Sequence, residues 1–348
     1  MSYVRPAIEA MSGYVPGEQP QAGKFIKLNT NENPYPPSPK VIQAIQAATN
    51  ESLLRYPDPM ATAFRIKAAE VLGVRPDWIL CGNGSDDILT ICTRAFVGEG
   101  QCLRLPYPSY VLYTTLARLQ NAAWDEVAFC DDWTLPDAFG QGRDDLRLAF
   151  LPNPNSPTGT LISRSRILEL AEQLPCPLLV DEAYVDFADA NCVDLVARNE
   201  KILVSRTLSK SYALAGLRFG FLIAQPQMIE QLTKVKDSYN CDALSIAGAT
   251  AALDDQAWLE DNRAKVIATR QRLTAELIKM GFGVIPSQAN FVWCRHATAS
   301  SQVLYEQLKA NRVLVRYMNY PRWTDGLRIS VGTDEQIDAL LALLASML

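Results

Sequence analysis

One lysine lies in the stretch SRTLSKSYALAGLRFGF (205–221), where small, hydroxylated and apolar residues surround it. Such neighbours can keep water away from Lys210, and desolvation favours the neutral amine that attacks a carbonyl carbon to form a Schiff base. Thr207, Ser209 and Arg218 in the same stretch offer two hydroxyls and a cation, which suit a bound phosphate. An isolated lysine is more often a solvated surface residue, so the interpretation depends on the groups that accompany it.

An acidic residue follows another apolar run. In LVDEAYVDF (179–187), Asp181 ends a predicted strand. A carboxylate in that position needs a cationic or hydrogen-bonding partner, because an isolated buried charge is costly. A helix N-cap would also explain Asp181. Tyr184, three residues later, is placed to direct its hydroxyl into the same pocket.

A glycine-containing turn follows a third run. In CGNGSDDILT (81–90), a strand ends, and Gly84, Ser85 and Asp86 lead into a helix. The exposed N–H groups at a helix start suit an anion such as phosphate. An ordinary N-cap turn would explain the same residues, and the pattern matches neither of the glycine-rich nucleotide motifs.

The combination of these stretches is more specific than any one of them. A carboxylate at 181, a lysine at 210 and an anion-holding turn at 84–86 are what pyridoxal phosphate needs. The acid pairs with the protonated pyridine nitrogen, the lysine forms the Schiff base, and the turn takes the phosphate. The loop LPNPNSPTGT (151–160) follows a further predicted strand at the same edge, although it also reads as a simple turn cluster.

The elements that must position these residues alternate along the chain. Short apolar runs predict strands, and amphipathic segments between them predict helices, which favours an α/β fold with a mostly parallel, helix-covered sheet. In such sheets ligands bind at the carboxyl ends of the strands, where these residues fall. The predicted strands are WILCG, QCLRL, LRLAFLP, PLLVDEAY, KILVSRT and RFGFLIA.

The pattern differs at both ends of the chain. Residues 1–37 are rich in Pro, Gly and Asn and predict an extended N-terminal arm, followed by a helix with Ser38 as its N-cap. Residues 38–240 would form the large cofactor-binding domain. Residues 241–348 predict a smaller α+β domain with the strands NFVWCR, VLVRY and LRISVG, closed by a helix that Thr333 caps.

Composition excludes several classes of function. The net charge of −5, with scattered basic residues, argues against nucleic acid or an anionic membrane as the partner. No apolar run approaches the roughly 20 residues needed to cross a bilayer, and the N-terminus lacks a secretory layout. The eight cysteines form no C-x-x-C pair, which indicates reduced thiols in a cytoplasmic protein. The single histidine leaves little for Ser-His-Asp catalysis or a metal site, so no metal is expected.

The motifs occur in a familiar order. RYPDP (55–59), GNGSDD, NPNSPTG, DEAY, TLSKSYALAGLR and LRISVGT (327–333) are similar to those of fold-type I pyridoxal phosphate aminotransferases. Within that family, LNTNENPYPP (28–37) and YN (239–240) resemble the histidinol-phosphate subgroup. The resemblance covers nearly the whole chain. It implies transamination between histidinol phosphate and 2-oxoglutarate in histidine biosynthesis, giving imidazole-acetol phosphate and glutamate.

The resemblance also implies roles for individual residues. Lys210 would form the Schiff base and move the proton, and Asp181 would keep the pyridine nitrogen protonated. Tyr184 would hydrogen-bond the ring oxygen, and Tyr110 would stack on the ring face. The cofactor phosphate would be held by Gly84, Ser85, Asp86, Ser209 and Arg218, with Tyr56 reaching it from a partner subunit.

The substrate side of the site follows from the same resemblance. Arg328 matches the arginine that binds the substrate carboxylate in aminotransferases. In the histidinol-phosphate subgroup, Arg328 and Arg316 would instead hold the substrate phosphate. Tyr14 of the arm would close over the substrate from the other subunit, so the resemblance implies a homodimer with shared active sites.

One position departs from the family pattern. The residue before Pro-Thr-Gly is usually an asparagine that bonds the cofactor ring oxygen, but here it is Ser156. The serine hydroxyl would make that contact at shorter reach, or Asn155 would shift into its place.

Alternative functions on the same scaffold are an aromatic amino-acid aminotransferase and a threonine-phosphate decarboxylase, which would release carbon dioxide. A non-catalytic cofactor-binding module, such as the sensor half of a transcription regulator, would normally carry a basic DNA-binding domain, and we do not expect that class here.

Overall fold

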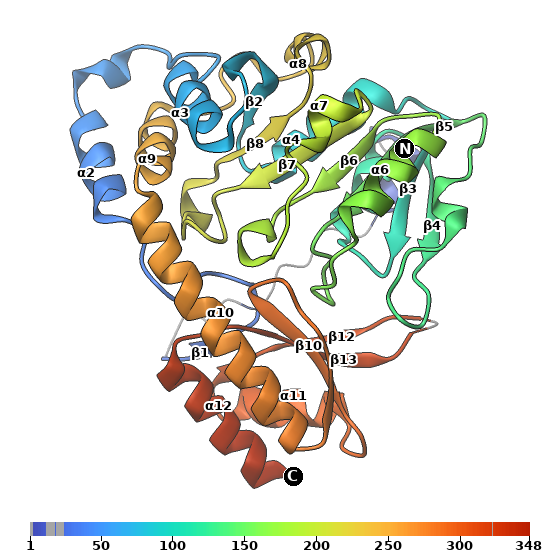
Figure 1. The fold of residues 1–348 in the computed structure, drawn as a ribbon, viewed down its shortest axis with the longest axis vertical. Coiled ribbons are helices and arrows are strands. Elements are labelled where there is room, and N and C mark those ends of the chain that lie inside the picture. The colour runs from blue at the N-terminus through green and yellow to red at the C-terminus, as the bar shows by residue number, and fades with distance from the viewer. Residues whose placement is uncertain (1–2, 12–17, 19–23, 322) are drawn as a thin grey trace.

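A seven-stranded sheet forms the core of the larger, upper part of the molecule in Figure 1. The computed structural model describes residues 3–11, 18, 24–321 and 323–348. β8 runs antiparallel to both of its neighbours, and the other pairs are parallel, which confirms the predicted mostly parallel sheet. In spatial order the strands are β2 (Ile79–Gly82), β8 (Gly220–Ile223), β7 (Ile202–Thr207), β6 (Leu178–Asp181), β5 (Leu146–Pro152), β3 (Cys102–Tyr107) and β4 (Ala123–Ala128).

Helices cover both faces of this sheet because its central strands are apolar on both sides. In β5, Leu148 and Phe150 belong to one buried cluster and Ala149 and Leu151 to another, as the two-residue alternation of a strand requires. On the Phe150 face lie α4 (Ser85–Phe96), α5 (Leu112–Leu119) and α8 (Pro226–Thr233). On the Leu151 face lie α2 (Pro39–Ala48), α3 (Thr62–Leu72), α6 (Arg164–Gln173), α7 (Leu195–Arg198) and α9 (Ala243–Leu253).

A second, antiparallel sheet of four strands lies beside the first (Figure 1). Its apolar cluster includes buried side chains of the helices α10 (Gln256–Lys279), α11 (Ser301–Ala310) and α12 (Asp334–Met347). Thr333 caps α12 in a capping box with Gln336, as predicted. In order the strands are β12 (Arg316–Asn319), β13 (Asp325–Ser330), β10 (Phe291–His296) and β9 (Phe282–Ile285).

The N-terminal arm joins this smaller layer. β1 (Ile26–Lys27) pairs in parallel with β11 (Val313–Leu314), which directly precedes β12. The run VLVRY was predicted as one strand and is divided between β11 and β12. The arm also includes the short helix α1 (Pro6–Glu9). Among the described helices, none combines the length and the apolar composition that a membrane crossing requires.

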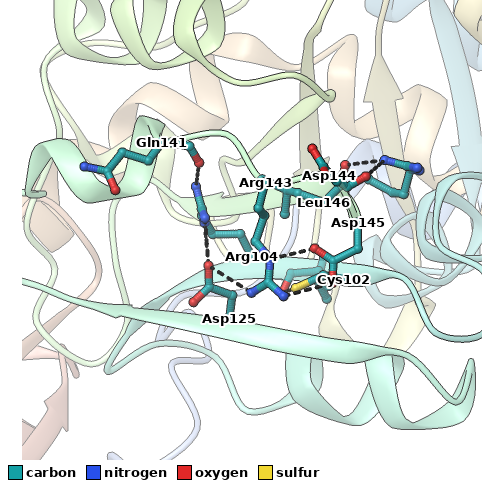
Figure 2. Close-up of polar contacts among 10 residues, drawn as sticks. Cys102, Arg104, Asp125, Gln141, Arg143, Asp144, Asp145 and Leu146 are labelled. Carbon is teal, nitrogen blue, oxygen red and sulfur yellow. Dashed lines mark hydrogen bonds and ion pairs between the residues drawn. The ribbon is translucent and has the colours of Figure 1, made fainter.

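A buried arginine makes a network of hydrogen bonds and ion pairs at one edge of the main sheet (Figure 2). Arg104 of β3 is 4% exposed and donates to Asp125 Oδ2 of β4 through Nε at 2.9 Å and Nη2 at 2.7 Å. Its Nη1 donates to the carbonyls of Phe139, at 2.9 Å, and Gln141. Arg143 lies 3.8 Å from the same carboxylate. This network attaches the exposed strand β4 to the sheet.

Candidate active site

A cavity of about 640 Å³ opens at the carboxyl ends of the parallel strands. Pro152, Asp181 and Thr207, the last residues of β5, β6 and β7, line it, together with Ser85 and Asp86 at the start of α4. Ligands bind at this edge of open α/β sheets, because loops that follow neighbouring strands converge there. The cavity therefore lies at the strand ends where the predicted site residues were expected.

Asp181 lies buried in the cavity wall and is 5% exposed. Tyr113 of α5 donates its hydroxyl to Oδ2 at 2.8 Å, and Ser205 of β7 donates to Oδ1 at 3.1 Å. Burial raises the pKa of the Asp181 carboxyl to about 6, while these two hydrogen bonds oppose the rise. A carboxylate held in this way suits a protonated ring nitrogen as its partner.

Lys210 lies three residues beyond the end of β7, and its side chain lines the cavity. Nζ donates to the carbonyl of Thr30 at 3.3 Å and lies 5.7 Å from the centre of the Tyr184 ring. Asn33 donates to the carbonyl of Lys210 at 3.1 Å and to that of Ser211 at 2.9 Å. The N-terminal arm thus fixes the backbone that carries the lysine.

The turn before α4 forms a cradle with Arg218. Gly84 has a φ of +83°, and a Cβ there would lie 2.7 Å from Nη2 of Arg218. The first N–H groups of α4 are therefore approached closely by a guanidinium, which suits a phosphate. Arg218 lies 3.4 Å from Asp86 Oδ2, and Ser209 lines the same cavity.

Two arginines lie opposite each other on adjacent strands of the smaller sheet. Arg316 of β12 and Arg328 of β13 are directly opposite in the strand register, and both line the cavity. Like charges in opposite positions destabilise a sheet, and an anion bound between them would offset that cost. Arg328 is held by Nη1 donating to Ser156 Oγ at 3.0 Å and Nη2 donating to the Asn29 carbonyl at 3.2 Å.

These cavity residues fit pyridoxal phosphate. The buried carboxylate of Asp181, the amine of Lys210 and the cradle at Gly84 lie around one cavity, as that cofactor requires. Tyr110 and Tyr184 also line it and offer an aromatic face and a phenol hydroxyl. Within the described ranges, no three acidic, histidine or cysteine side chains are arranged to hold a metal ion.

Gly84 does not itself line the cavity but directly precedes Ser85 and Asp86, which do, and three other predicted residues are not placed in the cavity. Asn155 is fully buried outside the cavity, where its Nδ2 donates to the Pro108 carbonyl at 3.2 Å and to Thr158 Oγ1 at 3.1 Å. Tyr56 is 79% exposed and stacks on Tyr239 at 4.4 Å, outside the cavity of its own chain. Tyr14 falls outside the described residues.

Several residues that line the cavity were not predicted from the sequence. The segment LNTNEN was noted only for its resemblance, yet Asn29, Thr30, Asn31 and Glu32 all line the cavity. Tyr113 of α5 was not predicted either, because nothing in the stretch PSYVLY (108–113) indicates that its hydroxyl contacts Asp181. Other lining residues that were not predicted include Ser109, Thr114, Thr115, Arg118, Met318 and Tyr320.

Comparison with known proteins gives consistent matches. A family model described as aminotransferase class I and II matches residues 23–344. The histidinol-phosphate aminotransferase of Rhodopirellula baltica is 61% identical over 341 residues, which cover 98% of this chain and 94% of that protein. Histidinol-phosphate aminotransferase 1 of Trichormus variabilis is 45% identical over 348 residues, covering 100% and 99%.

A solved structure matches the whole chain. The histidinol-phosphate aminotransferase of Sinorhizobium meliloti in complex with pyridoxal-5'-phosphate superposes with a TM-score of 0.88 at 25% identity. The match covers 100% of this chain and 99% of that one.

Proposed function

Because the chain belongs to the class I and II aminotransferase family, we propose that it transfers the amino group of histidinol phosphate to 2-oxoglutarate with pyridoxal phosphate as its cofactor. The products are imidazole-acetol phosphate and glutamate. The main structural support for a phosphorylated substrate is the facing pair Arg316 and Arg328, which line the same cavity as Lys210. The name and 61% identity of the Rhodopirellula baltica relative support the same substrate.

The cofactor supplies a carbonyl that takes up the amino group and a ring that accepts the electron pair of the broken bond. We assign the surrounding tasks to this chain's residues. Lys210 Nζ would hold the cofactor covalently and, once the substrate has freed it, would carry the proton from the substrate carbon to C4′ of the cofactor. Asp181 keeps the ring nitrogen protonated, Tyr184 bonds the ring oxygen, and Tyr110 covers one ring face.

The cofactor phosphate and the substrate phosphate bind at opposite sides of the cavity in this proposal. The turn at Gly84, Ser85 and Asp86, with Thr207, Ser209 and Arg218, takes the first. Arg316 and Arg328 take the second, because two guanidinium groups on adjacent strands match a dianion better than a single carboxylate.

The assembly we propose is a homodimer with shared sites. Leu53, Leu54, Tyr56 and Tyr239 are exposed apolar or aromatic side chains, and Tyr56 stacks on Tyr239. Apolar patches of this kind mark interaction surfaces. A partner chain seated here would bring Tyr56 to the neighbouring cofactor phosphate. The enzyme would act in the cytoplasm.

Kinetics with paired substrates test the proposed substrate. L-histidinol phosphate should give a kcat/KM about 10³-fold above that of L-histidinol, because the phosphate makes two or more charge-assisted hydrogen bonds. Arg316→Gln should narrow that gap and leave L-histidinol turnover unchanged. A preference for phenylalanine would instead support the aromatic aminotransferase, and carbon dioxide release from threonine phosphate would support the decarboxylase. Equal use of the two histidinols would refute the phosphate site.

A further inference from the structure

Residues 29–33 of the N-terminal arm contact several different groups of the site. The Asn29 carbonyl accepts from Arg328, and the Thr30 carbonyl accepts from Lys210 Nζ. Asn31 Nδ2 donates to the hydroxyl of Tyr184 at 3.1 Å. Asn33 donates to the backbone that carries Lys210. This segment therefore connects the substrate arginine, the lysine and the phenol of the cofactor site.

Asn31 is the most constrained residue of this segment. It is 1% exposed and has a φ of 55°, in the left-handed region that non-glycine residues rarely occupy. Its N–H donates to Ser330 Oγ at 2.8 Å, and its carbonyl accepts from Asn290 Nδ2 at 3.0 Å. Its Oδ1 accepts from Ser330 Oγ at 3.0 Å. A residue held in a rare conformation beside a site is a candidate for a positioning role.

Ser330 determines which way the Asn31 amide points. A serine hydroxyl has one proton to donate. The Ser330 oxygen accepts from the Asn31 N–H, and the Ser330 hydroxyl donates its own proton to Oδ1 of the same residue. That leaves Nδ2, a donor only, facing the Tyr184 oxygen. The serine thus fixes the amide in the donating orientation.

The orientation has a consequence for Tyr184. Among the described residues, Asn31 is the hydrogen-bond partner of the Tyr184 hydroxyl, and the hydroxyl oxygen is the acceptor. The phenol proton therefore points away from Asn31, and Tyr184 lines the cavity. We propose that Asn31, held by Ser330, is a positioning residue that makes Tyr184 a hydrogen-bond donor to the ring oxygen of pyridoxal phosphate. This inference rests on the proposed role of Tyr184.

A donated hydrogen bond favours the anionic ring oxygen, and this lowers the pH at which the visible band of the bound cofactor titrates. The charged and titratable groups around Asn31 and Tyr184 come from several other parts of the fold. Lys210 lies 5.7 Å from the Tyr184 ring, and Arg328 lies 5.3 Å from the ring of Phe291, which packs edge-on against Tyr184. Asp181, Tyr113 and Glu32 line the same cavity. The variants below leave all of these groups in place.

The test is a pH titration of the visible band of the purified holoenzyme, without substrate. Asn31→Gly keeps the left-handed backbone and removes the amide, so the apparent pKa of the band should rise by about one unit. Ser330→Ala should raise it in the same direction by releasing the amide. Asn31→Asp, which accepts the phenol proton, should raise it at least as far as Asn31→Gly.

A double-mutant cycle separates positioning from a general disturbance. In the Tyr184→Phe background, Asn31→Gly should produce no further rise. The matched control is Asn121→Gly, because Asn121 is exposed and also has a left-handed φ, of 54°; it should leave the band unchanged. Equal shifts with and without the Tyr184 hydroxyl, or no shift in any folded Asn31 or Ser330 variant, would overturn the proposal. The substrate plays no part in this titration, so failure of the histidinol-phosphate proposal would leave its result intact.

Discussion

The guanidinium of Arg328 donates a hydrogen bond of 3.0 Å to the hydroxyl of Ser156. This contact joins β13 of the smaller sheet to the loop that follows β5 of the larger one. At the position where the resemblance implies an asparagine directed at the cofactor, this chain has a short side chain bonded to the proposed substrate arginine. Ser156 lines the cavity, whereas Asn155 is fully buried outside it.

Removal of that hydroxyl should weaken substrate binding. Ser156→Ala leaves Arg328 with less support, so KM for L-histidinol phosphate should rise about fivefold, the equivalent of about 1 kcal/mol. The kcat should stay within about twofold, because the proposed role of Arg328 is to bind the substrate phosphate and not the carbon that reacts. Steady-state kinetics measure both, with Ser165→Ala on exposed α6 surface as the control. A fall in kcat at constant KM would contradict the assignment.

Loss of the lysine should abolish both colour and turnover. Lys210→Ala removes the amine that holds the cofactor covalently, so the visible band of the reconstituted protein and the steady-state rate should both disappear. Lys234→Ala, at an exposed position after α8, should retain both. Full activity in Lys210→Ala would rule out this residue as the Schiff-base lysine.

The buried acid should make the cofactor-free protein sensitive to pH. Asp181 has a pKa of about 6 in the fold against 3.8 for a free side chain, so the fold favours its protonated form. Stability from this group is fully present below about pH 4 and falls by about 3 kcal/mol as the pH rises through 6. Asp181→Asn should therefore match the parent protein near pH 4 and exceed its free energy of unfolding near pH 8.

Urea unfolding of the cofactor-free proteins at both pH values measures this difference. Asp131→Asn, on the exposed surface, is the control and should not alter the pH dependence. A constant gap between Asp181→Asn and the parent protein across that range would mean that burial does not raise the pKa of Asp181.

Removal of the Arg104 side chain at the sheet edge should lower the stability of the fold without lowering the catalytic activity. Arg104→Leu leaves two backbone carbonyls without this donor and Asp125 with only the more distant Arg143, so the free energy of unfolding should fall by about 3 kcal/mol. Arg75→Leu breaks an exposed pair with Asp77 and should change it by less than about 0.5 kcal/mol. Equal effects in denaturant unfolding would show that burial of Arg104 contributes nothing.

The proposed dimer depends on the exposed residues around Tyr56. Leu54 is 88% exposed in the isolated chain, and Leu54→Asp would place a charge in the interface. Sedimentation should find a dimer for the parent protein and a monomer with reduced activity for Leu54→Asp. Ile278→Asp, on exposed α10 surface, should remain dimeric. A fully active monomer at assay concentration would defeat the shared-site proposal.

The sequence predicted the central strands well because strands buried on both faces are continuously apolar. β4 lacked that signal: AWDEVA alternates exposed and half-buried residues at the sheet edge, and it was missed. The short strand β9 was also missed. The antiparallel direction of β8 depends on where the chain re-enters the sheet, which its own residues do not encode. The boundaries at 38 and 240 stay predictions.

The site was predictable where a motif contains the chemistry. Lys210, Asp181 and the turn at Gly84 fall at strand ends within short recognisable stretches. Their partners are not local: Tyr113 reaches Asp181 across 68 positions, and Asn31 reaches Tyr184 across 153. Contacts at such separations depend on the assembled fold, so no spacing rule could have found them.

The most direct test of the central claim is the visible spectrum of the holoenzyme during one half-reaction. L-histidinol phosphate is added alone, without a keto acid, and 2-oxoglutarate is added afterwards. We expect the visible band to bleach with the first addition and to return with the second. A band that persists with histidinol phosphate but bleaches with phenylalanine or tyrosine would contradict the proposed substrate. The absence of any band after reconstitution with pyridoxal phosphate would contradict the site itself.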